Sequence, residues 1–315
     1  MRAVLGILLL VACAPQAQAP RMDHPAPTSA RRIEWGLYQI CWGNRFRPML
    51  EEQLPKFASA PDYVMFYRDL GRPFPRAQID ILREKKCVPI ISLELWQWRR
   101  QRQGEYLTAI NNGEWDDFFR QWAKDAKAEG GRVLLRFGFE MNGDWFTWSL
   151  RPKEFIAAWR RAHRIMRDEV GARNVEWVWS PNVVSIPRTP ENGIHLYYPG
   201  DAAVDWVGVD GYNFGEEHDE WHKWEPFESV FDGVLDEFAK RYPGKPVMIA
   251  ETGAAPGTGD QRERWIREAY TYLARRPEVK ALIWFHYDKR RENEPDWRID
   301  TTPGSLRAFN ETFAR

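Results

Sequence analysis

Cysteine is scarce in this sequence, and neither sign of charge is in excess. The 315 residues include three cysteines, and 45 basic residues balance 45 acidic ones. So few cysteines cannot form the disulfide framework of a small secreted domain, but the chain is long enough to bury a sizeable core. A nucleic-acid partner would select an excess of lysine and arginine. We therefore expect a hydrophobic core and no nucleic-acid partner.

The sequence begins with an apolar run that is too short to cross a membrane as a helix. This run, residues 3–12, follows Arg2 and is typical of a signal peptide. It ends in Leu-Val-Ala-Cys13, which resembles the lipobox of bacterial lipoproteins. The resemblance implies a signal peptide over 1–12, lipidation of Cys13, and a secreted, membrane-anchored lipoprotein on the bacterial cell envelope. Ordinary secretion with cleavage near Ala19 is the alternative.

The next segment, residues 13–32, has little that could join a core. Residues 14–32 contain four prolines together with several alanines and glutamines. This composition predicts a disordered tether between the lipidated Cys13 and a folded domain. Cys41 and Cys87, the cysteines that remain, are expected to be free and buried.

From residue 33 onward, short apolar runs alternate with amphipathic segments. Eight runs predict strands, at 33–40, 63–67, 88–93, 132–139, 175–179, 204–209, 246–250 and 281–287. They are apolar almost throughout, as expected of parallel strands that are covered on both faces. Helical spacing of apolar residues predicts helices near 48–59, 76–85, 115–126, 155–166, 230–238, 261–274 and 304–313. The proline-rich segment 185–200 predicts a long loop in place of the fifth helix.

Eight such units over residues 33–315 predict an α/β fold, a single (β/α)8 TIM barrel. An open, doubly wound sheet is the alternative. Such a fold typically has a glycine-rich phosphate-binding turn after the first strand. Residues 41–45 read Cys-Trp-Gly-Asn-Arg instead.

Polar and aromatic residues gather where the predicted strands end, which is where a TIM barrel builds its active site. These residues are Trp42, Asn44, Glu94, Trp96, Glu140, Asn142, Trp145, Trp148, Asn182, Asp210, Tyr212, Asn213, Glu251, Trp284, His286 and Asp288. The chain also has 17 tryptophans, and indole faces stack well on sugar rings, although most tryptophans simply pack in cores. Together these features favour carbohydrate chemistry.

Two glutamates, Glu140 and Glu251, each follow an apolar run directly. A carboxyl group there is costly unless it is paired or used, and for either residue alone a structural ion pair is an equal alternative. Glycosidic cleavage needs two carboxyl groups on either side of the bond, one protonated and one ionised. If the groups are about 5–5.5 Å apart, the anomeric configuration is retained.

The segments around these glutamates, Arg136-Phe-Gly-Phe-Glu140-Met-Asn142-Gly-Asp-Trp145 and Ala-Glu251-Thr-Gly, resemble the catalytic segments of glycoside hydrolase family 26. The resemblance implies a retaining, endo-acting barrel enzyme that cleaves a β-linked polysaccharide, with β-1,4-mannan as the expected substrate. It also implies that Glu140 is the general acid/base and Glu251 the nucleophile. β-1,3-Xylan, mixed-linkage β-glucan and bacterial exopolysaccharide are alternative substrates.

Five further residues are expected to bind substrate: Arg136, Asn142, Trp145, Tyr212 and Trp284. By the resemblance, Trp145 lies beside the acid/base, Tyr212 near the nucleophile, and Trp284 beneath the sugar that is cleaved. Strand alternation puts Arg136 and Glu140 on one face, so a buried Arg136 would need a carboxylate partner. Glu251 is the expected partner, and another acid is the alternative.

The chain departs from the family at Phe139, where the family usually has histidine before the acid/base. Phenylalanine can neither donate nor accept a hydrogen bond, so any polar contact of that ring is lost. This departure leaves both catalytic carboxyl groups in place.

Other chemistries have weaker signals in the sequence. His218 and His222 lie among acidic residues, but the HExxH arrangement of a zinc site does not occur, and no G-x-S-x-G elbow follows a strand. We expect no cofactor, no metal and a monomer. A surface lipoprotein that binds glycan without cleaving it is the non-enzymatic alternative.

Overall fold

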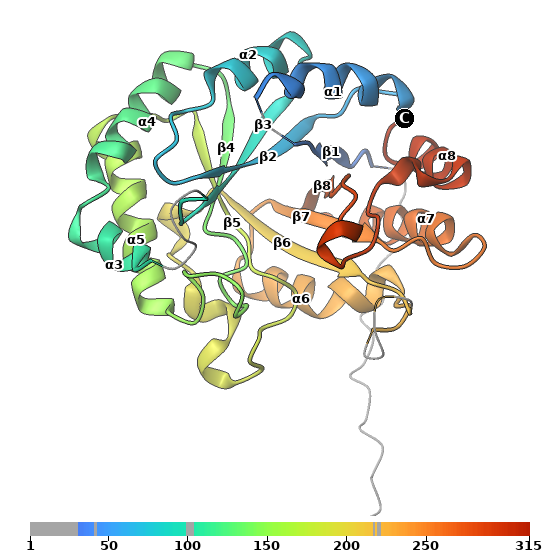
Figure 1. Ribbon diagram of the computed structural model, residues 1–315. Coiled ribbons are helices and arrows are strands. Elements are labelled where there is room, and N and C mark those ends of the chain that lie inside the picture. Colours follow the sequence, from blue (N-terminus) through green and yellow to red (C-terminus); the bar gives the residue numbers. More distant parts are fainter. Residues whose placement is uncertain (1–30, 41–42, 99–103, 217, 219–221) are drawn as a thin grey trace, which may run out of the picture.

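The structure, a computed structural model, describes residues 31–40, 43–98, 104–216, 218 and 222–315. In these residues, parallel strands close into a ring that helices surround (Figure 1). Each strand pairs with the next one in sequence, and β8 pairs with β1 to close the ring. The predicted (β/α)8 TIM barrel is therefore confirmed.

All eight strands fall where the sequence predicts them. They are β1 Glu34–Tyr38, β2 Tyr63–Asp69, β3 Val88–Glu94, β4 Val133–Phe137, β5 Val175–Trp179, β6 Trp206–Asn213, β7 Val247–Ala254 and β8 Val279–Trp284. The main differences are at β6 and β7, which run beyond their predicted ends at residues 209 and 250. Glu251 therefore lies within a strand and not after it.

The helices cover the outer faces of the strands. They are α1 Phe46–Gln53, α2 Arg76–Glu84, α3 Tyr106–Asn112, α4 Asp116–Glu129, α5 Pro152–His163, α6 Phe227–Arg241, α7 Gln261–Ala274 and α8 Pro303–Thr312. Both α3 and α4 lie between β3 and β4, and α5 continues as a π-helical turn over Arg164–Glu169. The sequence predicts all of these helices except α3, whose short span gives little periodicity.

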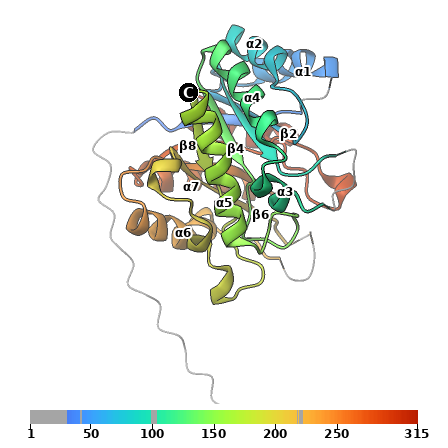
Figure 2. The same cartoon turned by 90° about the vertical axis from the view of Figure 1, so that its left-hand side faces the viewer.

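The connection from β5 to β6 contains no α-helix, and the structure describes all of its residues, 180–205. It contains three short 3-10 turns, Pro190–Asn192, Ile194–Tyr197 and Asp201–Ala203. Prolines interrupt it repeatedly, and each removes a backbone donor that a helix would need. Both views show this yellow-green segment standing out from the barrel (Figures 1 and 2). The long loop predicted in place of the fifth helix is confirmed.

Side chains of the strands alternate between the barrel interior and the layer beneath the helices. The interior core includes Met65, Leu134, Met248, Ala250 and Ile283. Trp284 follows Ile283 and therefore points outward, where it packs edge-on against Trp265 and Phe309 at ring distances of 5.9 and 5.8 Å.

The described chain begins at the amino-terminal end of the barrel, opposite the end where the strands finish. Arg31 donates to the carbonyl oxygen of Arg276 at 3.1 Å, just before β8 begins. The signal peptide, Cys13, most of the tether and Cys41 lie outside the described residues. Cys87 is a free, buried thiol, as predicted. No helix in the described part of the chain is both long and apolar enough to cross a membrane.

Candidate active site

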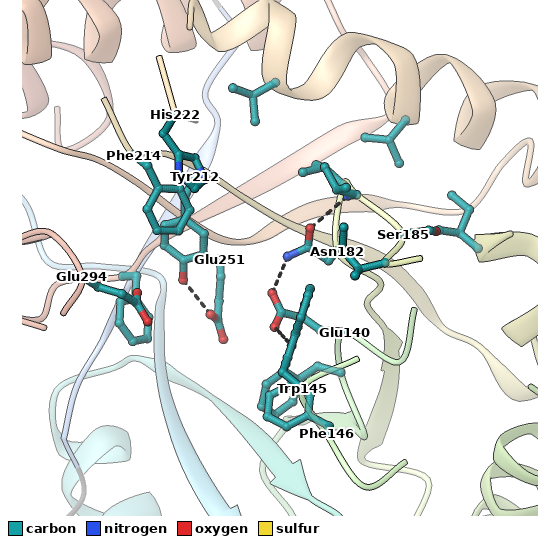
Figure 3. Close-up of a pocket in the computed structure, with 18 of the residues that line it drawn as sticks. Glu140, Trp145, Phe146, Asn182, Ser185, Tyr212, Phe214, His222, Glu251 and Glu294 are labelled. Atoms are coloured by element: carbon teal, nitrogen blue, oxygen red, sulfur yellow. Dashed lines mark hydrogen bonds between the residues drawn. The ribbon is translucent and has the colours of Figure 1, made fainter. Parts of the chain in front are cut away.

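A cavity of about 1850 Å³ opens at the carboxyl-terminal ends of the strands. Aromatic side chains form much of its wall: Tyr38, Tyr67, Trp96, Trp98, Phe139, Trp145, Phe146, Tyr212, Phe214, Phe285 and Tyr287. Glu140 and Glu251 both line this cavity, and Figure 3 shows their carboxyl groups turned into it. The structure therefore brings together two carboxyl groups that are far apart in the sequence.

Glu140 follows β4 in a tight left-handed turn. Gly138 has a φ of +54° and Glu140 itself has a φ of +50°, which is uncommon for a residue with a side chain. The backbone N–H of Glu140 donates to the carbonyl oxygen of Ser180 at 2.8 Å, which fixes the turn against the end of β5. This conformation aims the carboxyl group into the cavity, where strain is tolerated because surrounding contacts hold it.

Neutral donors hold the Glu140 carboxyl group. Asn182 Nδ2 donates to Oε1 at 2.7 Å, and Trp145 Nε1 donates to Oε2 at 2.9 Å (Figure 3). Burial, together with the nearby negative charge of Glu251, raises the pKa of Glu140 from 4.5 to about 7. Glu140 can therefore keep a proton near neutral pH, as a general acid must.

Glu251 reaches the cavity because β7 contains a bulge. Val209 of β6 pairs with Ile249, but the next residue, Asp210, pairs with Glu251, so Ala250 is extra. Ala250 belongs to the interior core, and regular alternation would send Glu251 outward. The inserted residue changes the phase of the strand and turns Glu251 back toward the interior.

The Glu251 carboxylate is only 4% exposed and accepts hydrogen bonds on both oxygens. Tyr212 donates its hydroxyl to Oε2 at 2.7 Å (Figure 3), while Tyr67 and Arg136 both donate to Oε1. A cation and two hydroxyl donors thus surround the carboxylate and fix its orientation. Burial and the neighbouring Glu251 raise the pKa values of both Tyr67 and Tyr212, so these hydroxyls remain donors.

Arg136 forms ion pairs with two carboxylates at once. Its guanidinium is fully buried, and it pairs with Asp210 through Nη2 and with Glu251 through Nη1. Burial disfavours its charge, but the two acids outweigh that effect and raise the pKa of Arg136. The predicted partner, Glu251, is confirmed, and a second acid shares the same cation.

Of the predicted site residues, four lie together on the cavity wall: Glu140, Trp145, Tyr212 and Glu251. Trp145 is 42% exposed, as suits a ring that could meet a sugar. Arg136, which the sequence predicts to bind substrate, lies behind Glu251 and has no exposed surface. That prediction is corrected: Arg136 positions the carboxylate and does not itself reach the cavity.

Asn142 and Trp284, both predicted to bind substrate, are fully buried away from the cavity. Asn142 accepts from the backbone N–H of Asn182 at 2.8 Å and donates to the carbonyl oxygen of Asn182 at 2.9 Å. It thus ties the loop after β4 to the loop after β5. Trp284 donates to the carbonyl oxygen of Trp297 at 2.6 Å within the outer layer. A substrate contact requires an accessible side chain, so these two predictions are corrected.

Tyr67 and Asn182 are parts of the site that the predicted set of site residues omits. Tyr67 ends a predicted strand, so its position in β2 was the available signal. Asn182 stands among the polar residues at strand ends, but its hydrogen bond to Glu140 depends on how the loop after β5 turns. Asp210 is also among the polar residues at strand ends. No sequence pattern shows that it pairs with Arg136 together with Glu251.

The ring of Phe139 packs against the guanidinium group of Arg136. It is 3% exposed, lines the cavity, and lies 4.2 Å from the guanidinium carbon of Arg136. A cation over an aromatic face is attracted to it, so Phe139 covers the buried ion pairs from the cavity side.

The histidine pair noted in the sequence lies beside Phe214. His218 and His222 lie with ring centroids 5.1 Å apart beside Phe214. Three acidic residues next to them in the sequence, Glu217, Asp219 and Glu220, lie outside the described residues. Within the described part of the chain, no three His, Cys, Asp or Glu residues gather as metal ligands do.

Comparison with known proteins gives consistent relatives. Residues 105–235 match the family model of Glycosyl hydrolase family 26. Endoglucanase H of Acetivibrio thermocellus is 34% identical over 249 residues, which are 76% of this chain and 25% of that protein. A mannan endo-1,4-beta-mannosidase of Bacillus subtilis is 27% identical over 135 residues, 35% of this chain and 36% of that protein. The chain thus spans between a quarter and about a third of these relatives.

Solved structures share the barrel. The Bacillus subtilis mannanase BCman superimposes with a TM-score of 0.62 at 17% identity, covering 91% of this chain and 87% of that one. A beta-mannanase from a symbiotic protist of the termite Reticulitermes speratus gives 0.61 at 16% identity, covering 93% of both chains. At these identities the likeness concerns the fold. Through residues 105–235 and its curated relatives, the chain is related to glycosyl hydrolase family 26, and these likenesses support a glycoside hydrolase.

Proposed function

We propose that this protein is a retaining, endo-acting glycoside hydrolase in which Glu140 is the acid/base and Glu251 the nucleophile. The observation that carries the proposal is the pair of carboxyl groups in one cavity, held in opposite environments. Burial and the nearby negative charge of Glu251 keep Glu140 protonatable, whereas Arg136 and two tyrosine hydroxyls all donate to the Glu251 carboxylate. Two such groups are what double displacement at an anomeric carbon requires.

In the first step, Glu251 attacks the anomeric carbon and Glu140 donates its proton to the leaving glycosidic oxygen. The C–O bond to the leaving chain breaks, and a glycosyl ester forms on Glu251. In the second step, Glu140 takes a proton from water, whose oxygen attacks the same carbon and releases Glu251. Two inversions give net retention. Tyr212 and Tyr67 position Glu251 by donating to its two oxygens, and Trp145 positions Glu140.

For the substrate we propose β-1,4-mannan. The Bacillus subtilis relative is named a mannan endo-1,4-beta-mannosidase, and mannanases are among the solved structures with this barrel. A β-glucan is the second candidate because the relative that covers 76% of this chain is named Endoglucanase H. The aromatic wall of the cavity suits either backbone, since both present apolar sugar faces.

The decisive measurement is the release of reducing ends from mannan, mixed-linkage β-glucan, β-1,3-xylan and bacterial exopolysaccharide, with Glu251→Ala as control. We expect mannan to be cleaved into products of mixed length, with β-configured new ends in the first minutes by NMR. New ends of α configuration would contradict retention. Binding without turnover on every polysaccharide would favour the non-catalytic glycan-binding alternative.

We also propose that the protein is carried on the bacterial envelope by a lipid on Cys13. The support is the lipobox-like Leu-Val-Ala-Cys13 after an apolar run. Expression with an alkyne-labelled fatty acid should label the wild type and leave Cys13→Ser unlabelled. Equal labelling of both would refute the assignment, and it would leave the proposed hydrolase activity untouched.

A further inference from the structure

The cavity has a second arm that leaves the carboxyl groups along α6. One wall of this arm comes from the loop after β5, through Val183, Val184, Ile194 and His195, and the other comes from α6. The arm exists because no helix fills the space between β5 and β6. Ser185, which also lines the cavity, lies beyond Asn182 on the side away from Glu251 (Figure 3).

A single stripe of α6 forms the second wall. Its members are Ser229, Val230, Gly233, Val234, Glu237 and Arg241, which repeat at helical spacing. From the first to the last of these residues the helix rises roughly 18 Å. The arm is therefore long enough for more than one sugar ring, and it is continuous with the space around Glu140.

Gly233 widens this arm. It lies in the middle of α6, where glycine is unfavourable compared with alanine. A Cβ atom added to Gly233 would meet no heavy atom within 4 Å, so packing does not require a glycine there. The missing side chain leaves the helix backbone open to a ligand.

Groups that can hydrogen-bond to sugar hydroxyls stand toward the far end of the arm. Arg241 Nε lies 2.8 Å from Glu237 Oε1, and His195 Nδ1 lies 4.0 Å from the same oxygen. All three side chains keep between 32% and 47% of their surface exposed, so a ligand can reach them. They supply both donors and acceptors, as neutral carbohydrate requires.

The lining of this arm differs from that of the main cavity. Among the described residues that line the arm on the loop and on α6, none is phenylalanine, tyrosine or tryptophan, and the walls combine aliphatic with polar side chains. Accessible aromatic rings that could carry the polysaccharide backbone line the cavity elsewhere, for example Trp145 and Tyr287. We infer that the α6 arm binds a neutral sugar side branch of the polysaccharide while the backbone lies across Glu140 and Glu251. This inference rests on the proposed function and adds a substrate class to it.

The test compares linear β-1,4-mannan with galactomannan, whose mannan backbone carries single galactosyl branches. Gly233→Trp fills the arm, and Ala239→Trp places the same residue on an exposed position of α6 that does not line the cavity. We expect Gly233→Trp to lower the ratio of kcat/KM on galactomannan to kcat/KM on linear mannan at least tenfold. Ala239→Trp should leave that ratio unchanged, and thermal melting verifies that both variants fold.

A second variant addresses the polar end without filling space. His195→Ala should raise KM for galactomannan severalfold more than KM for linear mannan. Parallel losses on both polymers in Gly233→Trp and His195→Ala, or no loss on either, would overturn the branch assignment. A wild type that cleaves linear mannan but not galactomannan would overturn it as well. A wild type that cleaves neither polymer would contradict the proposed mannanase function itself, which is a different outcome.

Discussion

Two glutamates, one just after β4 and one within β7, lie in different settings. Glu140 sits in a left-handed turn, half-buried, with Asn182 and Trp145 as neutral donors. Glu251 sits inside a strand past a bulge, nearly inaccessible, with a buried arginine and two tyrosines as donors. Chemically identical carboxyl groups thus meet different surroundings: burial and a neighbouring charge raise the pKa of Glu140, whereas a cation and two hydroxyls donate to Glu251.

Removing Glu251 should have the largest effect. Glu251→Ala is expected to lower kcat on the preferred polysaccharide by about 10⁴-fold or more, because alanine has no oxygen that could form the covalent intermediate at this position. Initial rates of reducing-end release measure this loss. Glu268→Ala, at an exposed position on α7, is the matched control and should retain full activity. A Glu251→Ala enzyme with more than a few per cent of wild-type activity would end the nucleophile assignment.

Removing the acid should have a smaller and more selective effect. Glu140→Ala is expected to lower activity on polysaccharide by about 10²- to 10⁴-fold, since the leaving oxygen then departs without a proton. Aryl glycosides with acidic phenol leaving groups need little protonation, so their first step should be much less affected. Comparable losses on both kinds of substrate would show that Glu140 is not the acid.

Removing the second acid that pairs with Arg136 should have a moderate effect on kcat and on its pH dependence. Asp210→Asn leaves Arg136 to pair with Glu251 alone, which weakens Glu251 as a nucleophile, and we expect kcat to fall by roughly tenfold. Asp210 and Glu140 repel each other when both are ionised, so the substitution should also move the basic limb of the pH profile below its wild-type position near pH 7. Asp117→Asn, at a fully exposed side chain, is the control. An unmoved basic limb would argue that Asp210 has only a structural role.

The smallest expected effect concerns stability and has the opposite sign. Because the pKa of Glu140 rises from 4.5 to about 7 on folding, ionising it costs the folded state free energy above pH 4.5, fully so above pH 7. Glu140→Gln removes that cost and should raise the free energy of unfolding at pH 8 by up to about 3 kcal/mol. At pH 4 the variant and the wild type should unfold alike. Denaturant unfolding at both pH values checks this, and a variant less stable than wild type at pH 8 would contradict it.

Much of the fold is predictable because its signals are local. Apolar runs mark all eight strands, and the prolines of the segment 185–200 mark the connection without a helix. The two carboxyl groups are predictable for a related reason, since each stands out against the apolar residues before it.

What the sequence could not give is the direction in which side chains point. Trp284 belongs to a run that is apolar on both faces, so its pattern does not distinguish the interior from the outer layer. Asn142 stands beside catalytic residues, yet a polar residue at a strand end can equally well join two loops. The bulge at Ala250 depends on the pairing of β7 with its neighbours, and that pairing involves residues that are distant in sequence.

Arg31 lies at the amino-terminal end of the barrel, on the opposite side from the cavity, where it donates to the carbonyl oxygen of Arg276. If Cys13 carries a lipid, the tether joins the barrel on the side away from the cavity, and the mouth is free to turn toward the surroundings. Bulky polymers then approach without crowding against lipid headgroups, and the products are released on the same outer side.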